Sequence, residues 1–136
     1  MSDEIDEIRR RKLSELRAAA DADGDESASR SPSEPIPIGG RAELDRTIAE
    51  HDPVLVDFSA DWCGPCRMLE PVVERVAAET DAAVATVDID ANQRLAADYS
   101  VRSVPTLLLF DGGQPAERLV GMQDESRLRS VIEAHA

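Results

Sequence analysis

Two cysteines three residues apart are the side chains of this chain best suited to chemistry. They stand in Trp62-Cys63-Gly64-Pro65-Cys66, directly after the apolar run of residues 54–58, and the chain has no other cysteine. A cysteine at the start of a helix meets unpaired backbone amides, which favour its thiolate form. The sequence therefore predicts a dithiol, placed between a strand and a helix, that undergoes reversible disulfide exchange.

The two sulfurs are expected to have different tasks. Disulfide exchange needs one sulfur that is ionised and reachable and a second one that resolves the mixed disulfide. With Cys63 at the helix cap and Cys66 one turn further on, Cys63 attacks and Cys66 resolves. Gly64 lets the backbone approach a partner closely, and Pro65 sits in a first turn, where its missing amide costs nothing.

Two plainer interpretations of the cysteines stay open, half of a zinc site and a pair of inert core thiols. Zinc would need further ligands, and besides carboxylates only His51 and His135 are available, both at expected helix ends. The acidic run of residues 21–26 is similar to a calcium loop but lacks the glutamate of that loop. We therefore predict no metal site.

Asp57 is the second informative residue, because it interrupts the most apolar strand expected in the chain, residues 54–58. An ionised carboxylate there is costly without a partner, so burial should raise its pKa. Six residues before Cys63, Asp57 can underlie the dithiol and take the proton of Cys66 when that sulfur attacks. The alternative is that strand alternation turns Asp57 outward into solvent.

Composition bounds the class of protein. A chain of 136 residues that is 42% hydrophobic suits one domain, and its net charge of −13 argues against binding to nucleic acid or to an anionic membrane. Lys12 is the only lysine, and acids are spread along the sequence. We interpret this as an acidic, halophile-like surface suited to a salt-rich cytoplasm, with ordinary solubility by charge as the alternative. With no run of ~18 apolar residues and an acidic N-terminus, the chain is expected to be cytoplasmic.

Residues 1–37 differ in composition from the rest and are expected to form an N-terminal extension. Residues 2–20 favour a helix with a narrow apolar stripe, which either docks on a partner or stays a solvated tail. Residues 21–37 are polar, acidic and proline-bearing, which predicts a flexible linker.

Residues 38–136 alternate between strand and helix patterns, which predicts an α/β domain. Strands are expected at 54–58, 83–89, 106–110 and 116–120, with a turn at 111–113. Helices are expected at 42–50, at 66–80 with an interruption by Pro71, at 92–99 and at 124–134. Strands that alternate with helices imply parallel crossovers, and the last strand adds an antiparallel edge. The result is a central mixed sheet with helices on both faces.

A series of ordered motifs resembles the thioredoxin family. The series consists of Val56-Asp57-Phe58, Trp62-Cys63-Gly64-Pro65-Cys66-Arg67, Pro71, Val87-Asp88-Ile89-Asp90, Val104-Pro105-Thr106, Asp111-Gly112-Gly113 and Gly121. The resemblance runs from about residue 38 to 136 and implies a thioredoxin-like fold for that domain. The first 37 residues fall outside it.

The resemblance implies roles for individual residues. Cys63 is then the nucleophile, Cys66 the resolving cysteine of a Cys63–Cys66 redox disulfide, and Asp57 the buried proton acceptor. Only about 5% of bonds before proline are cis, so Val104-Pro105 alone would be expected trans; in the family the counterpart of Pro105 is cis and faces the dithiol. There the backbone at Ser103 and Val104 pairs with the substrate, and an apolar docking rim is formed by Trp62, Gly64, Pro65, Val104, Gly121 and Met122.

The implied activity is reduction of disulfides in oxidised proteins by a monomer without bound cofactor or metal, with electrons from a separate thioredoxin reductase. The dipeptide Gly64-Pro65 between the cysteines favours reduction of protein disulfides over a glutaredoxin-like activity. The alternatives are a disulfide oxidase or isomerase, which more often carries histidine in that dipeptide, and a dithiol-gated binding adaptor. Two departures stand out, because many members have tryptophan where this chain has Ser59 and lysine where it has Thr86.

Overall fold

The structure is a computed structural model that describes residues 32–135. The predicted helix 2–20 and most of the predicted linker 21–37 lie outside the described residues. In chain order the elements are β1 (Ile36–Pro37), α3 (Arg41–Glu50), β2 (Val54–Ser59), α4 (Gly64–Glu79), β3 (Ala83–Asp88), α5 (Gln93–Asp98), β4 (Thr106–Asp111), β5 (Gln114–Val120) and α6 (Glu125–His135).

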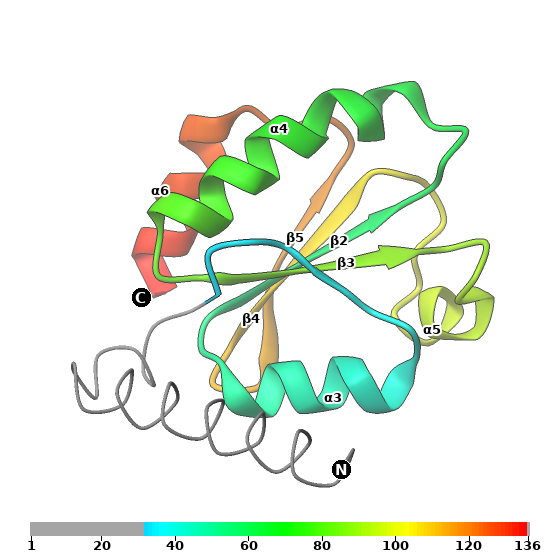
Figure 1. The fold of residues 1–136 in the computed structure, drawn as a ribbon, viewed down its shortest axis with the longest axis horizontal. Coiled ribbons are helices and arrows are strands. Elements are labelled where there is room, and N and C mark those ends of the chain that lie inside the picture. Colours follow the sequence, from blue (N-terminus) through cyan, green and yellow to red (C-terminus); the bar gives the residue numbers. More distant parts are fainter. Residues whose placement is uncertain (1–31, 136) are drawn as a thin grey trace, which may run out of the picture. The chain divides into compact units, whose positions relative to one another are not determined.

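The five strands form one mixed sheet, in the order β1-β3-β2-β4-β5 (Figure 1). β1 and β2 both run parallel to β3, whereas β4 pairs antiparallel with β2 and with β5. The central strand β2 is buried from Val54 to Phe58. This confirms the expected thioredoxin-like architecture, a mixed sheet flanked by helices.

Helices cover both faces of the sheet, with α4 and α6 on one side and α3 and α5 on the other (Figure 1). Strand alternation divides β2 accordingly: Leu55 packs with α4 and α6, whereas Val54 and Val56 pack with α3 and α5. Asp57 lies two residues after Leu55 on the strand, so its side chain is on the same face of the sheet, toward α4. Because this face is covered, alternation does not turn Asp57 into open solvent.

The direction of β4 corrects one expectation. The sequence predicted parallel crossovers between all strands separated by a helix, but β4 runs antiparallel to β2, with Thr106 opposite Phe58. α5 has six residues and rises about 9 Å, too short to return along a strand of about 20 Å. The chain thus re-enters the sheet at the edge where β2 and β3 end.

α4 corrects a second expectation, because it continues through Pro71 and already begins at Gly64. Pro71 has no backbone N–H, so the carbonyl four residues before it has no helical partner. Because Pro71 is exposed, that carbonyl can accept a hydrogen bond from water. The short strand β1 was not predicted, because two residues are too few to show the alternation of apolar and polar side chains that is typical of a strand.

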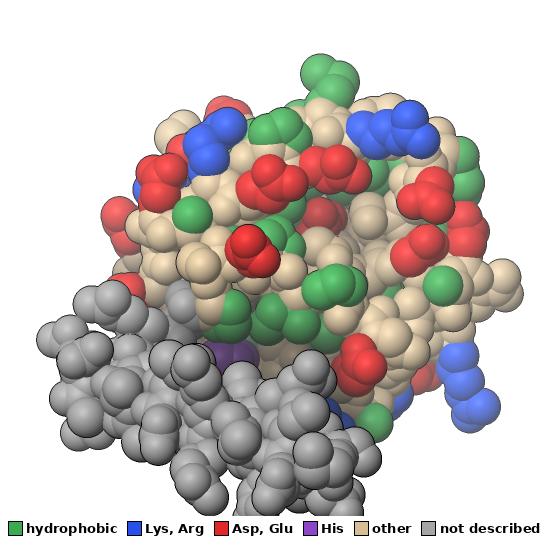
Figure 2. Space-filling model, viewed as in Figure 1, with side chains coloured by type: hydrophobic (Ala, Val, Ile, Leu, Met, Phe, Trp, Pro, Cys, Tyr) green, Lys and Arg blue, Asp and Glu red, His purple; other side chains and the backbone are tan. Residues whose placement is uncertain are grey.

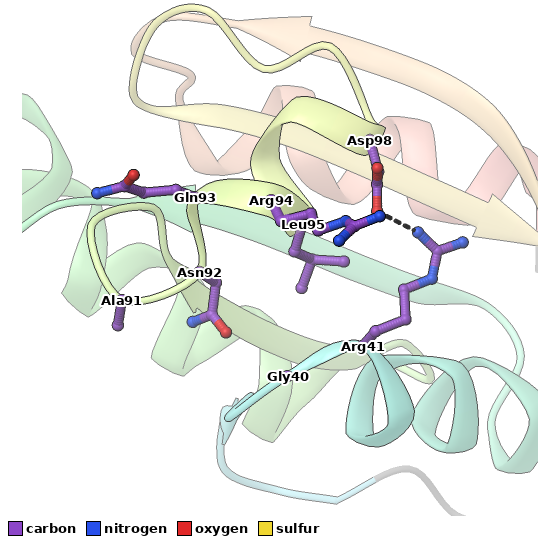
Figure 3. A pocket seen from close by; sticks show the side chains of 8 residues that line it. All are labelled: Gly40, Arg41, Ala91, Asn92, Gln93, Arg94, Leu95 and Asp98. Atoms are coloured by element: carbon purple, nitrogen blue, oxygen red, sulfur yellow. Dashed lines mark hydrogen bonds and ion pairs between the residues drawn. The ribbon is translucent and has the colours of Figure 1, made fainter.

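A pocket of about 450 Å³ lies between α3 and α5, on the face away from α4 (Figure 3). Arg41 at the start of α3 forms an ion pair of 2.8 Å with Asp98 at the end of α5. No cysteine lines this pocket. The ion pair joins the two helices across this pocket. Among residues 32–135 no helix combines the length and the apolarity that crossing a membrane requires.

Candidate active site

The dithiol stands where the sequence predicted it, between β2 and α4. Cys63 is the N-cap of α4 and Cys66 lies in its first turn, and a disulfide joins the two residues, whose Cα atoms are 5.2 Å apart. Pro65 occupies the first turn, where no helical amide is lost. Cys63 is only 4% exposed in this oxidised state, so this residue is more covered than the sequence suggested.

The start of α4 is electrostatically suited to a thiolate at residue 63. The backbone amide of Cys66 donates to Cys63 Sγ at 3.2 Å, and no acidic residue lies in the first turn of the helix. The partial positive charge of the helix N-terminus is therefore not offset by a nearby carboxylate of that turn. These features lower the cost of a negative charge on the sulfur.

The loop before β4 closes over the disulfide. Cys63 Sγ lies 3.7 Å from the carbonyl oxygen of Val104, and Ala60, Ile89 and Val104 pack around the two cysteines. The Val104–Pro105 peptide bond is cis, as the resemblance implied and against the base rate. Gly121, at a φ of 87°, donates its amide to the Pro105 carbonyl at 2.8 Å. The structure thus brings Val104, Pro105 and Gly121 together beside the dithiol.

Asp57 is buried, with 2% of its surface exposed, and its Oδ1 atom has no hydrogen-bond partner within the described residues. Burial, and to a lesser degree the charge of Glu70, raises the pKa of Asp57 from 3.8 to about 7. Cys66, Leu69 and Val73 are buried and succeed one another at helical spacing on the face of α4 that packs against the sheet. Asp57 and Cys66 therefore lie on facing elements.

Asp57 borders a pocket of about 340 Å³ between α4 and the β1 edge of the sheet. We call it the acidic pocket, because its ionisable lining residues, within residues 32–135, are all carboxylic acids: Asp57, Asp61, Glu70, Glu74 and Asp88. Thr86 pairs with Asp57 across the strands and also lines the pocket, as does Ser59. Figure 2 shows acidic side chains over α4 and beside it.

Four large apolar side chains are exposed in the described part of the chain, two of them next to the cysteines in sequence and two near Gly121. Trp62 is 68% exposed, and its indole Nε1 donates to Asp90 at 2.8 Å; Met122 is 47% exposed. Gly64 and Pro65 are exposed as well. Met68, which is 68% exposed, and Val120 were not predicted as exposed apolar residues from the sequence. An apolar residue two positions after Cys66 on the outer face of the helix was the signal that could have revealed Met68.

The histidines considered as zinc ligands do not meet the cysteines. His135 lies 2.9 Å from Asp111 and 3.4 Å from Glu117, so it joins the end of α6 to the β4–β5 hairpin, and these contacts raise its pKa. In the part of the chain that the structure describes, no group of three or more metal-binding side chains occurs.

Comparison with known proteins gives consistent results. The family model described as thioredoxin matches residues 39–134. A thioredoxin of Chlamydia trachomatis is 51% identical over 83 residues, which is 60% of this chain and 81% of that protein. A bifunctional thioredoxin reductase/thioredoxin of Mycobacterium leprae is 46% identical over 83 residues, 60% of this chain and 18% of that protein. The solved structure of a mutant thioredoxin from Halobacterium salinarum superposes with a TM-score of 0.76 at 56% identity, covering 77% of this chain and 93% of the other.

Proposed function

Because the chain belongs to the thioredoxin family and is a thiol-disulfide oxidoreductase with protein-disulfide reductase activity, we propose that it is a general reductase of disulfides in cytoplasmic proteins. The single observation that carries the assignment of roles is the position of Cys63 as N-cap of α4, with the Cys66 amide on its sulfur. This position supports Cys63 as the attacking sulfur and Cys66 as the resolving one.

In the first step the Cys63 thiolate attacks one sulfur of a substrate disulfide. A bond forms between Cys63 Sγ and that sulfur, the substrate S–S bond breaks, and the second substrate sulfur leaves as a thiolate that takes a proton from water. The helix N-terminus and the Cys66 amide stabilise the anion before attack. The product is a mixed disulfide on Cys63.

In the second step the Cys66 thiol gives its proton to Asp57 and attacks Cys63 Sγ. The mixed disulfide breaks, the remaining substrate sulfur leaves as a thiolate, and the Cys63–Cys66 disulfide forms, so two electrons have passed to the substrate. Burial of Asp57 and its raised pKa support its role as the proton acceptor, because its affinity for a proton then suits neutral pH. The acidic pocket offers a path by which water can exchange that proton.

Substrates dock, in this proposal, as extended segments along Ser103 and Val104, with cis-Pro105 facing the disulfide. Trp62, Gly64, Pro65, Gly121 and Met122 form the surrounding rim, which we extend by Met68. Backbone pairing and a flat apolar rim read little of the substrate sequence, which suits a wide range of oxidised proteins.

Thioredoxins work with thioredoxin reductase, and we propose that a separate reductase returns electrons to the Cys63–Cys66 disulfide of this chain. The bifunctional relative, whose name joins the two activities in one protein, supports that partnership. We further propose that the protein is a monomer that binds neither nucleic acid nor membranes, since its net charge of −13 repels both polyanions and suits a salt-rich cytoplasm.

Reduction of insulin with dithiothreitol as electron source tests the function. We expect the full chain to turn over and Cys66→Ser to accumulate mixed disulfides on Cys63, which mass spectrometry of trapped partners detects. Cys63→Ser is the matched control, expected to trap nothing. A full chain that binds partners without reducing insulin would favour the adaptor alternative.

The domain boundary at about residue 37 is also part of the proposal, and the family match over residues 39–134 supports it. Deletion of residues 1–31, which keeps strand β1 (Ile36–Pro37) in the sheet, should leave insulin reduction intact. Loss of activity would place the extension in the working site.

A further inference from the structure

A third pocket lies beside the loop that precedes β4 and covers the disulfide, and the proposed function assigns no role to it. It has a volume of about 400 Å³ and is lined by Ser100, Arg102, Ser103, Thr106, Arg118 and Val120. We call it the basic pocket, because its ionisable lining residues, within the described part of the chain, are two arginines. In a chain with 28 acidic and 15 basic residues, this pocket has no acid among its described lining residues.

The basic pocket is continuous with the surface where a substrate is proposed to lie. Ser103 and Thr106 flank Val104 and cis-Pro105, and Val104 O is the atom 3.7 Å from Cys63 Sγ. The Thr106 hydroxyl donates to Ser103 O at 2.7 Å, and Thr106 pairs with Val120 across the β4–β5 ladder. These bonds hold the wall of the pocket next to the disulfide.

The two arginines leave donors unused. Arg118 donates from Nη2 to the backbone carbonyl of Tyr99, which fixes its guanidinium and leaves its other N–H groups unengaged in the described residues. The Arg102 side chain is exposed and has no hydrogen-bond or ion-pair partner within residues 32–135. A guanidinium presents several donors in one plane and matches a carboxylate with two parallel hydrogen bonds.

We propose that the basic pocket binds a carboxylate of the substrate protein, an Asp or Glu side chain near the attacked cysteine. This inference rests on the proposed function, because it needs a substrate that lies along Ser103 and Val104. An extended chain advances about 3.3 Å per residue, so an acidic side chain within about three residues of the cysteine reaches the pocket. The apolar rim accepts many sequences, and Arg102 with Arg118 selects among them by charge.

Paired peptide substrates test this inference. Each contains one disulfide, and a glutamate is moved through the positions on either side of the attacked cysteine, with glutamine at the same position in its partner peptide. For the full chain we expect one position at which the glutamate peptide is favoured by about 3- to 10-fold in kcat/KM. Arg102→Gln should bring this ratio to about one, and Arg102→Glu should favour a lysine peptide at that position.

Arg46→Gln is the matched control, since it removes the same charge from the exposed surface of α3, outside the basic pocket. It should keep the full ratio. At ~1 M salt the ratio should fall, because exposed charges are screened. If the full chain reduces all glutamate and glutamine peptides equally, or if Arg102→Gln keeps the preference, the carboxylate pocket is refuted while the reductase function stands. If no peptide is reduced at all, the proposed function itself fails and the inference fails with it.

Discussion

The acidic pocket and the basic pocket both begin at the edge of the sheet where β2 ends and β4 starts, yet they carry opposite charge. The acidic pocket holds the buried Asp57 and four further acids, with no cation among its described lining residues. The basic pocket holds Arg102 and Arg118 on the surface. In our proposal this difference separates two tasks: the buried carboxyl of the acidic pocket takes up a proton, and the guanidiniums of the basic pocket bind the substrate protein.

The largest effect is expected on the acidic side. Asp57→Asn keeps the shape of the side chain but removes the proposed proton acceptor, so resolution of the mixed disulfide should slow by about 100-fold at neutral pH. Because the pKa of Asp57 is about 7, the resolving rate of the full chain should rise as pH increases through that value, whereas the variant should lose this dependence. Stopped-flow kinetics from about pH 6 to 9 measures both. Equal profiles would remove Asp57 from the mechanism.

The same carboxyl should make stability depend on pH. Its folded pKa, about 7, lies above its ordinary value of 3.8, so the unfolded chain releases this proton first. The contribution of Asp57 to stability therefore declines as pH rises from about 4 to about 7 and is constant above that. The two pKa values correspond to about 4 kcal/mol at most. Urea unfolding should show Asp57→Asn more stable than the parent at pH 8, with the difference vanishing near pH 4.

A smaller effect is expected from the neighbour of Asp57. Glu70→Gln removes the charge that adds to the raised pKa of Asp57, so the midpoint of the resolving step should move to lower pH. Glu74→Gln is the control, since Glu74 lines the same pocket but is not among the causes of that shift. Identical midpoints in both variants would mean that desolvation alone sets the pKa.

The local part of this arrangement could be predicted from the sequence. An apolar run followed by Cys63-Gly64-Pro65-Cys66 predicts a strand, a cap and a helix, and these elements are present. The burial of Asp57 followed from the same run, because a strand covered on both faces leaves no outward position.

What could not be predicted depends on tertiary neighbours. The antiparallel pairing of β4 with β5 was predicted, but its register, with a shift between Leu109 and Phe110, was not, and this register brings residues 118–120 next to residues 100–106 in the basic pocket. Glu70 beside Asp57 and the cover over Cys63 likewise arise from contacts between segments. The local pattern of apolar and polar residues does not reveal such contacts between segments that are far apart in the sequence.

The central claim is that Cys63 is the anionic, reactive sulfur and Cys66 the protected one. A short pulse of iodoacetamide on the fully reduced protein near pH 7, followed by peptide mass spectrometry, tests it directly. We predict that Cys63 is alkylated while Cys66 stays unmodified. Equal and slow labelling of both cysteines would contradict the account.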